Sequence, residues 1–191
     1  PYPIMEDTSA GPPSHPSPPQ PLRPNRGKLT LVFIVTIAVG LVLGNALRAP
    51  DTQSGPMVGR IAPEVVADVF GGGEFRLSDH LADDGRPLVL NLWASWCLEC
   101  REEFPAFSQF ARANPDIAVV GVAVNDQRED AVAFWEQTES DFVVGFDTTQ
   151  RLRTSYPGFG LPVTFVIDER GAVTHQLEGG VTTEDLEALF R

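Results

Sequence analysis

The sequence predicts an α/β domain in which helices cover both faces of a mixed central sheet, with one transmembrane helix before it. Two observations indicate the sheet. Short apolar runs alternate with amphipathic runs between residues 59 and 191, and the last two strands read as a hairpin after the strand–helix alternation. A third observation indicates the membrane helix, because residues 29–47 are apolar and uncharged. The stretch 59–191 has the length of one domain.

The predicted strands are either apolar runs or segments of hairpins that turn on Gly. In chain order they span residues 64–70, 74–77, 87–93, 116–124, 142–146, 163–168 and 172–177. Glycines 71–73 join the first two strands into an extra N-terminal hairpin, and Gly171 marks the turn of the last hairpin. The strands at 87–93 and 116–124 are nearly continuous apolar runs, which predicts burial on both faces.

The predicted helices follow the strands at amphipathic spacing and span residues 97–112, 129–136 and 183–190. Pro105 lies inside the first helix, where we expect a kink. Thr182 or Thr183 is the expected N-cap of the last helix, since Glu184 and Asp185 follow in its first turn.

Cys97 and Cys100 are the only cysteines, and they lie where a buried strand passes into a helix. The free N–H groups and the positive dipole at a helix N-terminus favour a thiolate over a thiol at Cys97. A thiolate attacks disulfides, and Cys100, one helical turn further on, can then resolve the mixed disulfide. The pair therefore predicts redox chemistry.

Two other interpretations of the pair are weaker. A zinc site takes about four ligands, and the three histidines, His15, His80 and His175, are not in ligand spacing with the cysteines. A purely structural disulfide is the second alternative, but closing so short a loop removes little entropy from the unfolded chain.

As a helix, residues 29–47 would be about 29 Å long at about 1.5 Å per residue, close to the hydrocarbon thickness of a bilayer. A buried core helix is the alternative, but residues 1–28 are rich in proline and serine and predict a disordered tail. Arg23, Arg26 and Lys28 precede the segment, and only Arg48 follows closely. The positive-inside rule then predicts a single-pass protein of the cell membrane, with residues 1–28 cytoplasmic and the domain extracytoplasmic.

A cleaved signal peptide remains open for the same segment, with a small-residue site at 44–46. The apolar run exceeds the usual length of about 7–15 residues for a signal peptide, which favours an uncleaved signal anchor. Residues 48–58 are then a linker to the domain at 59–191. In either case the cysteines reach a compartment where disulfides persist.

The charge balance limits the partners. The chain has 14 Lys and Arg against 26 Asp and Glu, a net charge of −12, which excludes general affinity for nucleic acid. We expect a soluble acidic surface, and a monomer that docks transiently on its partners.

The motifs resemble those of the thioredoxin family. Trp96 and the C-x-x-C pair follow a buried strand, and Pro162 lies in the segment 160–168, Gly-Leu-Pro-Val-Thr-Phe-Val-Ile-Asp. More closely, residues 91–97 and 101–105 resemble the membrane-anchored ResA/TlpA/CcmG type. Proteins of that type are extracytoplasmic thiol–disulfide oxidoreductases, several of which serve cytochrome c maturation. The resemblance implies a thioredoxin-like fold and no cofactor beyond the Cys97–Cys100 disulfide.

The resemblance also implies roles for particular residues. Cys97 is the attacking thiol and Cys100 the resolving thiol, and Pro162 is a cis-proline that shapes the substrate groove. Trp96, Leu98 and Leu161 are the expected substrate-binding residues. Glu103 matches a carboxylate near the active site that can exchange a proton with Cys100. A solvated surface carboxylate is the alternative for Glu103.

Two departures from the family pattern bear on the redox chemistry. Cytoplasmic thioredoxins carry an Asp where this chain has Asn91, and a Lys that has no counterpart after Lys28, so their buried Asp–Lys relay is absent. Glu99 occupies a position that is usually Pro. A carboxylate there favours the helix start, but beside a thiolate it raises the thiol pKa. A raised thiol pKa disfavours the dithiol form and indicates a reductant.

Three functions are consistent with these features. The first is a membrane-anchored reductase that opens disulfides of exported proteins with cysteine pairs, such as apocytochrome c, and exchanges electrons with a membrane donor or acceptor. The second is an oxidase of the same fold that forms disulfides. The third is a copper-binding assembly module, because copper(I) favours thiolates, but the chain offers only Met5 and Met57 as further soft ligands.

Overall fold

The computed structural model describes residues 55–191, which belong to one compact unit of the chain. The predicted tail, the predicted transmembrane segment 29–47 and most of the predicted linker lie outside the described residues. Within residues 55–191, no helix combines the length and the apolar character needed to cross a bilayer.

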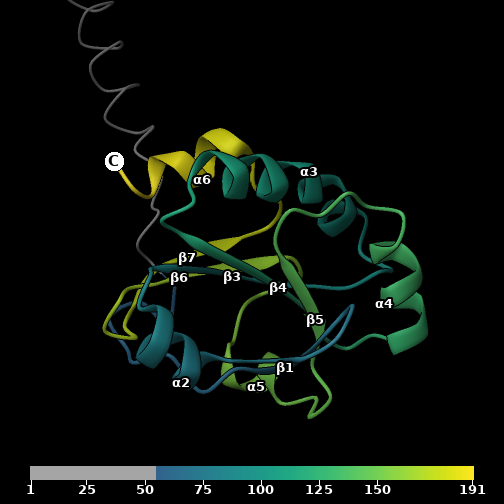
Figure 1. The fold of residues 1–191 in the computed structure, drawn as a ribbon, viewed down its shortest axis with the longest axis horizontal. Coiled ribbons are helices and arrows are strands. Elements are labelled where there is room, and N and C mark those ends of the chain that lie inside the picture. The colour runs from purple at the N-terminus through teal and green to yellow at the C-terminus, as the bar shows by residue number, and fades with distance from the viewer. Residues whose placement is uncertain (1–54) are drawn as a thin grey trace, which may run out of the picture. The chain divides into compact units, whose positions relative to one another are not determined.

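A seven-stranded mixed sheet forms the centre of the described domain, in the order β2-β1-β5-β4-β3-β6-β7 (Figure 1). Strands β3, β4 and β5 are parallel to their neighbours within this group, whereas β1, β2, β6 and β7 join antiparallel. The bounds are β1 Val66–Val69, β2 Glu74–Arg76, β3 Leu88–Trp93, β4 Ala118–Ala123, β5 Val143–Phe146, β6 Val163–Ile167 and β7 Val173–Glu178.

All seven predicted strands are confirmed, with ends that differ from the predicted bounds by at most two residues. The β1–β2 hairpin turns on three glycines with positive φ, a conformation that a side chain disfavours. Gly171, with a φ of 80°, plays the same part between β6 and β7.

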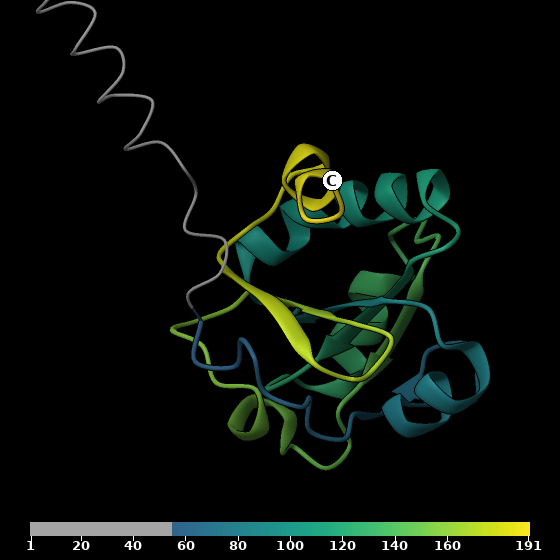
Figure 2. The same ribbon diagram turned by 90° about the vertical axis from the view of Figure 1, so that its left-hand side faces the viewer.

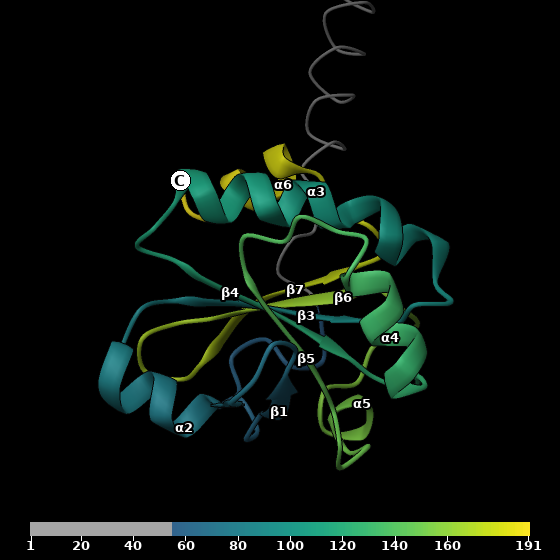
Figure 3. The same cartoon turned by 45° about the vertical axis from the view of Figure 1, so that its right-hand side comes forward.

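Two layers of helices cover the sheet (Figures 2 and 3). Helices α3 (Leu98–Ala113) and α6 (Thr183–Ala188) lie together on one face. The short segments α2 (Leu77–Asp79), η1 (His80–Asp84) and α5 (Leu152–Ser155) lie on the other face, and α4 (Arg128–Trp135) packs near the end of β3.

The predicted helices are confirmed as α3, α4 and α6, and Pro105 lies inside α3. Thr182 is the N-cap of α6, in a capping box with Asp185. Segments α2, η1 and α5 were not predicted, because each is too short to show helical periodicity. A buried carboxylate holds the start of α5, since Asp147 Oδ2 accepts a hydrogen bond from the backbone N–H of Leu152 at 2.8 Å.

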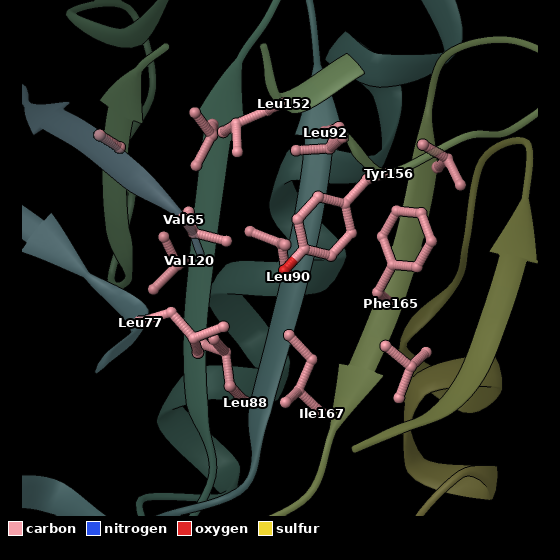
Figure 4. Close-up of a cluster of buried hydrophobic side chains, with 14 of the residues drawn as sticks. Val65, Leu77, Leu88, Leu90, Leu92, Val120, Leu152, Tyr156, Phe165 and Ile167 are labelled. Carbon is pink, nitrogen blue, oxygen red and sulfur yellow. The ribbon is translucent and has the colours of Figure 1, made fainter. Parts of the chain in front are cut away.

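Strand β3 divides the core. Every residue of β3 is buried, which confirms the expectation from its continuous apolar run. Leu88, Leu90 and Leu92 enter an apolar cluster with Tyr156 and Phe165 on the face of α5 (Figure 4). The alternate residues of β3 face α3, where Val89 and Trp93 lie in apolar clusters and Asn91 hydrogen-bonds to Glu103.

Candidate active site

The end of β3 delivers the two cysteines onto the start of α3, as predicted. Cys97 is the N-cap residue, and its Sγ accepts a hydrogen bond from the backbone N–H of Cys100 at 3.2 Å. The two residues form a disulfide. Cys97 retains 7% of its surface, whereas Cys100 is fully buried, so only Cys97 meets solvent. This asymmetry suits an attacking Cys97 and a resolving Cys100.

The loop before β6 lies against the cysteines. The Leu161–Pro162 peptide bond is cis, as the resemblance implied. Leu161 is half-buried and packs against the hydrophobic cluster that contains Cys97 and Cys100. The carbonyl of Pro162 accepts a hydrogen bond from the N–H of Gly179 at 3.0 Å, which ties this loop to the end of β7.

Three large apolar side chains project into solvent, two next to Cys97 in the chain and one in the loop before Pro162. Trp96 is 65% exposed, and its Nε1 donates to the backbone carbonyl of Asn125 at 3.0 Å. Leu98 is 70% exposed and Phe159, in the loop before Pro162, is 97% exposed. Phe159 was not predicted as a site residue, since only its place before Pro162 hints at a role.

Glu103 is buried one helical turn beyond Cys100 on α3, so the interpretation as a solvated surface carboxylate is wrong. Its Oε1 accepts from Asn91 Nδ2 at 2.9 Å and its Oε2 from the backbone N–H of Val181 at 3.1 Å. Burial raises the pKa of Glu103 to about 8, the two hydrogen bonds oppose that rise, and the charge of Glu99 adds to it. A carboxyl group with this pKa can take or give a proton near neutral pH.

Asn91 connects Glu103 to β6. The Asn91 side chain is fully buried, and its Nδ2 also donates to Thr164 Oγ1 at 3.2 Å. Its Oδ1 is buried and has no hydrogen-bond partner among residues 55–191. Neither Asn91 nor Thr164 was predicted as a functional residue, and Asn91 was noted only for replacing an Asp.

Asp126 holds the loop before the cysteines, and sequence reasoning missed it. Its side chain is buried and accepts from the backbone N–H and the hydroxyl of Ser95 and from the backbone N–H of Gln127. The only sequence signal was the place of Asp126 after a buried strand. The loops after β3 and β4 are therefore fixed to each other beside Cys97.

A surface pocket leads from solvent to Glu103. It is lined by Glu99, Glu102, Glu103, Gly180, Val181 and Thr182. Glu99 lies over the loop after β7, since a Cβ added to Gly180 would come within 3.8 Å of the Glu99 Cβ. Carboxylates therefore surround the route by which a proton on Glu103 reaches water.

A metal site does not emerge from residues 55–191, in which no group of three or more His, Cys, Asp or Glu side chains is placed to hold an ion. His80, one of the histidines weighed as a zinc ligand, instead has its Nε2 2.9 Å from the carbonyl of Arg86.

Comparisons with known proteins agree with this geometry. The sequence pattern of the AhpC/TSA family matches residues 58–176. The chain is 30% identical to the thiol–disulfide oxidoreductase ResA of Geobacillus kaustophilus, over 84% of this chain and 90% of that protein. It is 27% identical to the thiol:disulfide interchange protein DsbE of Escherichia coli K12, over 79% of this chain and 83% of that protein.

Among solved structures, a thiol:disulfide interchange protein described as DsbE from Chlorobium tepidum superimposes with a TM-score of 0.62 and 32% identity. The superposition covers 70% of this chain and 92% of that chain.

Proposed function

We propose a reductive, extracytoplasmic role for this chain, which belongs to the AhpC/TSA family of thioredoxin-like proteins and is a thiol–disulfide oxidoreductase of the ResA and DsbE type. The observation that carries the reductive direction is the acidic surroundings of the cysteines. A thiolate on Cys97 would share the first turn of α3 with the carboxylate of Glu99. Like charges destabilise the thiolate and hence the dithiol form, which makes the dithiol a better electron donor.

The helix start opposes this effect. Cys97 at the N-cap accepts the N–H of Cys100, and such a contact stabilises a thiolate and would favour an oxidant. A free-energy difference of about 1.4 kcal/mol changes the reduction potential of this two-electron couple by about 30 mV. The balance between the helix start and the nearby carboxylate therefore decides whether the pair acts as a reductant or an oxidant. We place the balance on the reductive side because Glu99 adds a carboxylate to the first turn of α3, two residues after Cys97, where it opposes the ionisation of the thiol.

The reductive cycle uses both cysteines and one proton acceptor. The Cys97 thiolate attacks a partner disulfide, forms a mixed disulfide and releases the first partner sulfur as a thiolate. Glu103 takes the proton of the Cys100 thiol, and the Cys100 thiolate then attacks Cys97 Sγ and releases the second partner sulfur. Two electrons pass to the partner, and the Cys97–Cys100 disulfide remains.

The apolar residues near Cys97 would bind the partner protein. Trp96 and Leu98 offer exposed apolar surface on one side, and Leu161 and Pro162, in the loop before β6, form the other side. An exported protein with a cysteine pair, such as apocytochrome c, is the partner we propose. Residues 29–47 would anchor the domain in the cell membrane, close to the membrane electron donor that returns Cys97 and Cys100 to the dithiol form.

The test is to trap the partner with full-length Cys100→Ser expressed in intact cells. Cys97 should then hold partner proteins as mixed disulfides that diagonal gels separate and mass spectrometry identifies. The double variant Cys97→Ser, Cys100→Ser is the control and should trap nothing. If Cys100→Ser traps no protein from membranes, the exchange role proposed here is wrong.

Alkylation of free thiols in the same cells separates the reductase from the oxidase. A reductase should hold Cys97 and Cys100 mostly as thiols, whereas a disulfide-forming oxidase should hold them mostly as a disulfide.

A further inference from the structure

The buried side chains around Glu103 satisfy one protonation state of its carboxyl group but not the other. Both carboxyl oxygens face donors: Oε1 meets Asn91 Nδ2 at 2.9 Å and Oε2 meets the N–H of Val181 at 3.1 Å. This arrangement fits an ionised carboxylate, which only accepts. A protonated Glu103 would direct its O–H at a donor unless one of these neighbours changed its role.

The backbone N–H of Val181 cannot change its role, but the amide of Asn91 can. An amide side chain carries a donor and an acceptor at opposite ends of one plane. The acceptor of Asn91, Oδ1, is the buried side-chain oxygen without a hydrogen-bond partner in the described part of the chain. A buried unpartnered carbonyl costs about 1–3 kcal/mol, so its presence beside Glu103 requires an explanation.

Thr164 permits the exchange of roles. Its Oγ1 now accepts from Asn91 Nδ2 at 3.2 Å, and a hydroxyl can equally donate. If the Asn91 amide turns by half a rotation about its last bond, Oδ1 takes the place of Nδ2. It then accepts both from the protonated Glu103 and from the Thr164 hydroxyl.

The charged groups facing Glu103 do not supply an alternative acceptor deep in the site. On α3, Glu99 and Glu102 line the outer pocket. From β3 and β6, the hydrogen-bonded partners are the neutral Asn91 and Thr164. The loop after β7 contributes the backbone of Val181, and Asp185 of α6 is engaged in the cap with Thr182.

We propose that Asn91 is the positioning residue for the proton of Glu103, and that its amide donates to the ionised carboxylate and turns to accept from the protonated one, with the Thr164 hydroxyl following. The inference rests on the proton transfer proposed above, and it assigns the network that lets Glu103 stay hydrogen-bonded before and after Cys100 loses its proton.

The test is solution NMR of the full chain in its disulfide form, in which neither cysteine titrates. We expect the Asn91 side-chain amide signals to titrate together with the carboxyl carbon of Glu103. The Nδ2 protons should lie close to the Thr164 γ-methyl above the midpoint and move away from it below the midpoint.

Glu103→Gln provides the matched reference, because glutamine imitates the protonated carboxyl group. In Glu103→Gln the Asn91 amide should keep, at every pH, the signals that the unaltered protein shows at low pH. If the Asn91 contacts do not change through the carboxyl titration, or if Glu103→Gln keeps the high-pH pattern, the proposal is wrong. Neither result depends on the direction of the redox reaction, so the reductase role stands or falls separately.

Asn91→Leu, which is similar in size, supplies the kinetic test on the reduced protein. We expect the midpoint of the pH profile of thiol–disulfide exchange to rise by about one pH unit or more, since the ionised carboxylate loses a charge-assisted hydrogen bond. If folded Asn91→Leu keeps the pH profile of thiol–disulfide exchange of the unaltered chain, Asn91 only packs in the core and the proposal is wrong.

Discussion

The two faces of β3 meet different environments. Leu88, Leu90 and Leu92 pack into an apolar cluster with Tyr156 (Figure 4). The Tyr156 hydroxyl donates a hydrogen bond to the backbone carbonyl of Pro63. On the opposite face, Asn91 hydrogen-bonds to Glu103 and Thr164. One strand, buried throughout, therefore serves both a dry core and a buried polar network.

The apolar face of β3 therefore serves stability, and the face toward α3 serves the chemistry. The cluster around Leu88, Leu90 and Leu92 can be packed for density alone, because its members carry no charge. The α3 side carries a buried carboxyl group whose ionised form is costly, which is how a proton acceptor near neutral pH arises. Mutations on the two sides should therefore differ in kind as well as in size.

The largest effect on activity is expected on the α3 side. Cys97→Ser should abolish thiol–disulfide exchange with a disulfide-bonded peptide, because the attacking sulfur is lost. Its far-UV circular dichroism should stay that of the unaltered chain, since Cys97 retains contact with solvent and caps α3. Residual exchange at a comparable rate would show that Cys97 is not the nucleophile.

The largest effect on stability is expected on the apolar side. Leu90→Ala should lower the free energy of unfolding by about 2–5 kcal/mol, as expected when a fully buried leucine is cut back to alanine. Denaturant unfolding measures the loss. The midpoint of the pH profile of exchange should not move, and a shifted profile would contradict the division between the two faces.

Glu103→Gln should change how stability depends on pH. The pKa of Glu103 is about 8 in the folded chain against an ordinary value of 4.5, so folding favours its protonated form. This contribution is complete below about pH 4.5 and is lost as the pH rises through about 8. Relative to the unaltered chain, Glu103→Gln should gain about 1–3 kcal/mol between those limits.

Urea unfolding of the unaltered chain and of Glu103→Gln, both in the disulfide form, measures this difference in stability across the pH range. A stability difference that does not change between about pH 5 and pH 9 would mean that Glu103 titrates at its ordinary value.

Asp126→Asn should separate the effect of the loop before Cys97 on the reduction potential from its effect on the stability of the fold. Asp126 accepts from Ser95 and Gln127 beside the cysteines, and Asp147 accepts in a similar way from Thr149 and Leu152 near α5. Asp126→Asn and Asp147→Asn each replace one acceptor oxygen of a buried carboxylate with an NH2 donor, and each should lower the free energy of unfolding by about 1–3 kcal/mol.

Asp147→Asn is thus the matched control. Only Asp126→Asn should also change the reduction potential, because only Asp126 holds the loop before Cys97. Equal potentials in the two variants would show that this loop does not tune the disulfide.

The smallest effect on stability is expected at the surface. Leu98→Ser and Ile61→Ser should each change stability by about 0.5 kcal/mol or less, since the two side chains are 70% and 71% exposed. Only Leu98→Ser should raise the KM for a protein substrate, because Ile61 pairs with Ala172 at the far end of the β6–β7 hairpin from Pro162. Equal KM values would remove Leu98 from the docking surface.

Local sequence patterns predicted the parts of the fold that depend on local order. Strands β3 and β4 showed as apolar runs, β2 and β7 showed through the Gly turns before them, and Thr182 was one of two expected caps of α6. The segment α5 gave no signal because a single turn has no periodicity, and its start depends on Asp147 from the preceding loop.

The site was predictable only where a motif is contiguous. Cys97, Cys100 and Pro162 lie in such motifs. The partners of Glu103 do not: Asn91 precedes it by 12 residues, and Val181 follows it by 78. No local pattern relates residues so distant, so the network emerges only when β3, β6 and the loop after β7 come together under α3.

The measurement that tests the central claim most directly is the reduction potential of the Cys97–Cys100 pair. Equilibration of the protein with thiol–disulfide buffers gives it, with the fluorescence of Trp93 and Trp96 as the readout. A potential at or below about −220 mV, toward the thioredoxin value of about −270 mV, is the result we predict for a reductant. A potential near about −120 mV would make the chain a disulfide-forming oxidase and contradict the reductive role.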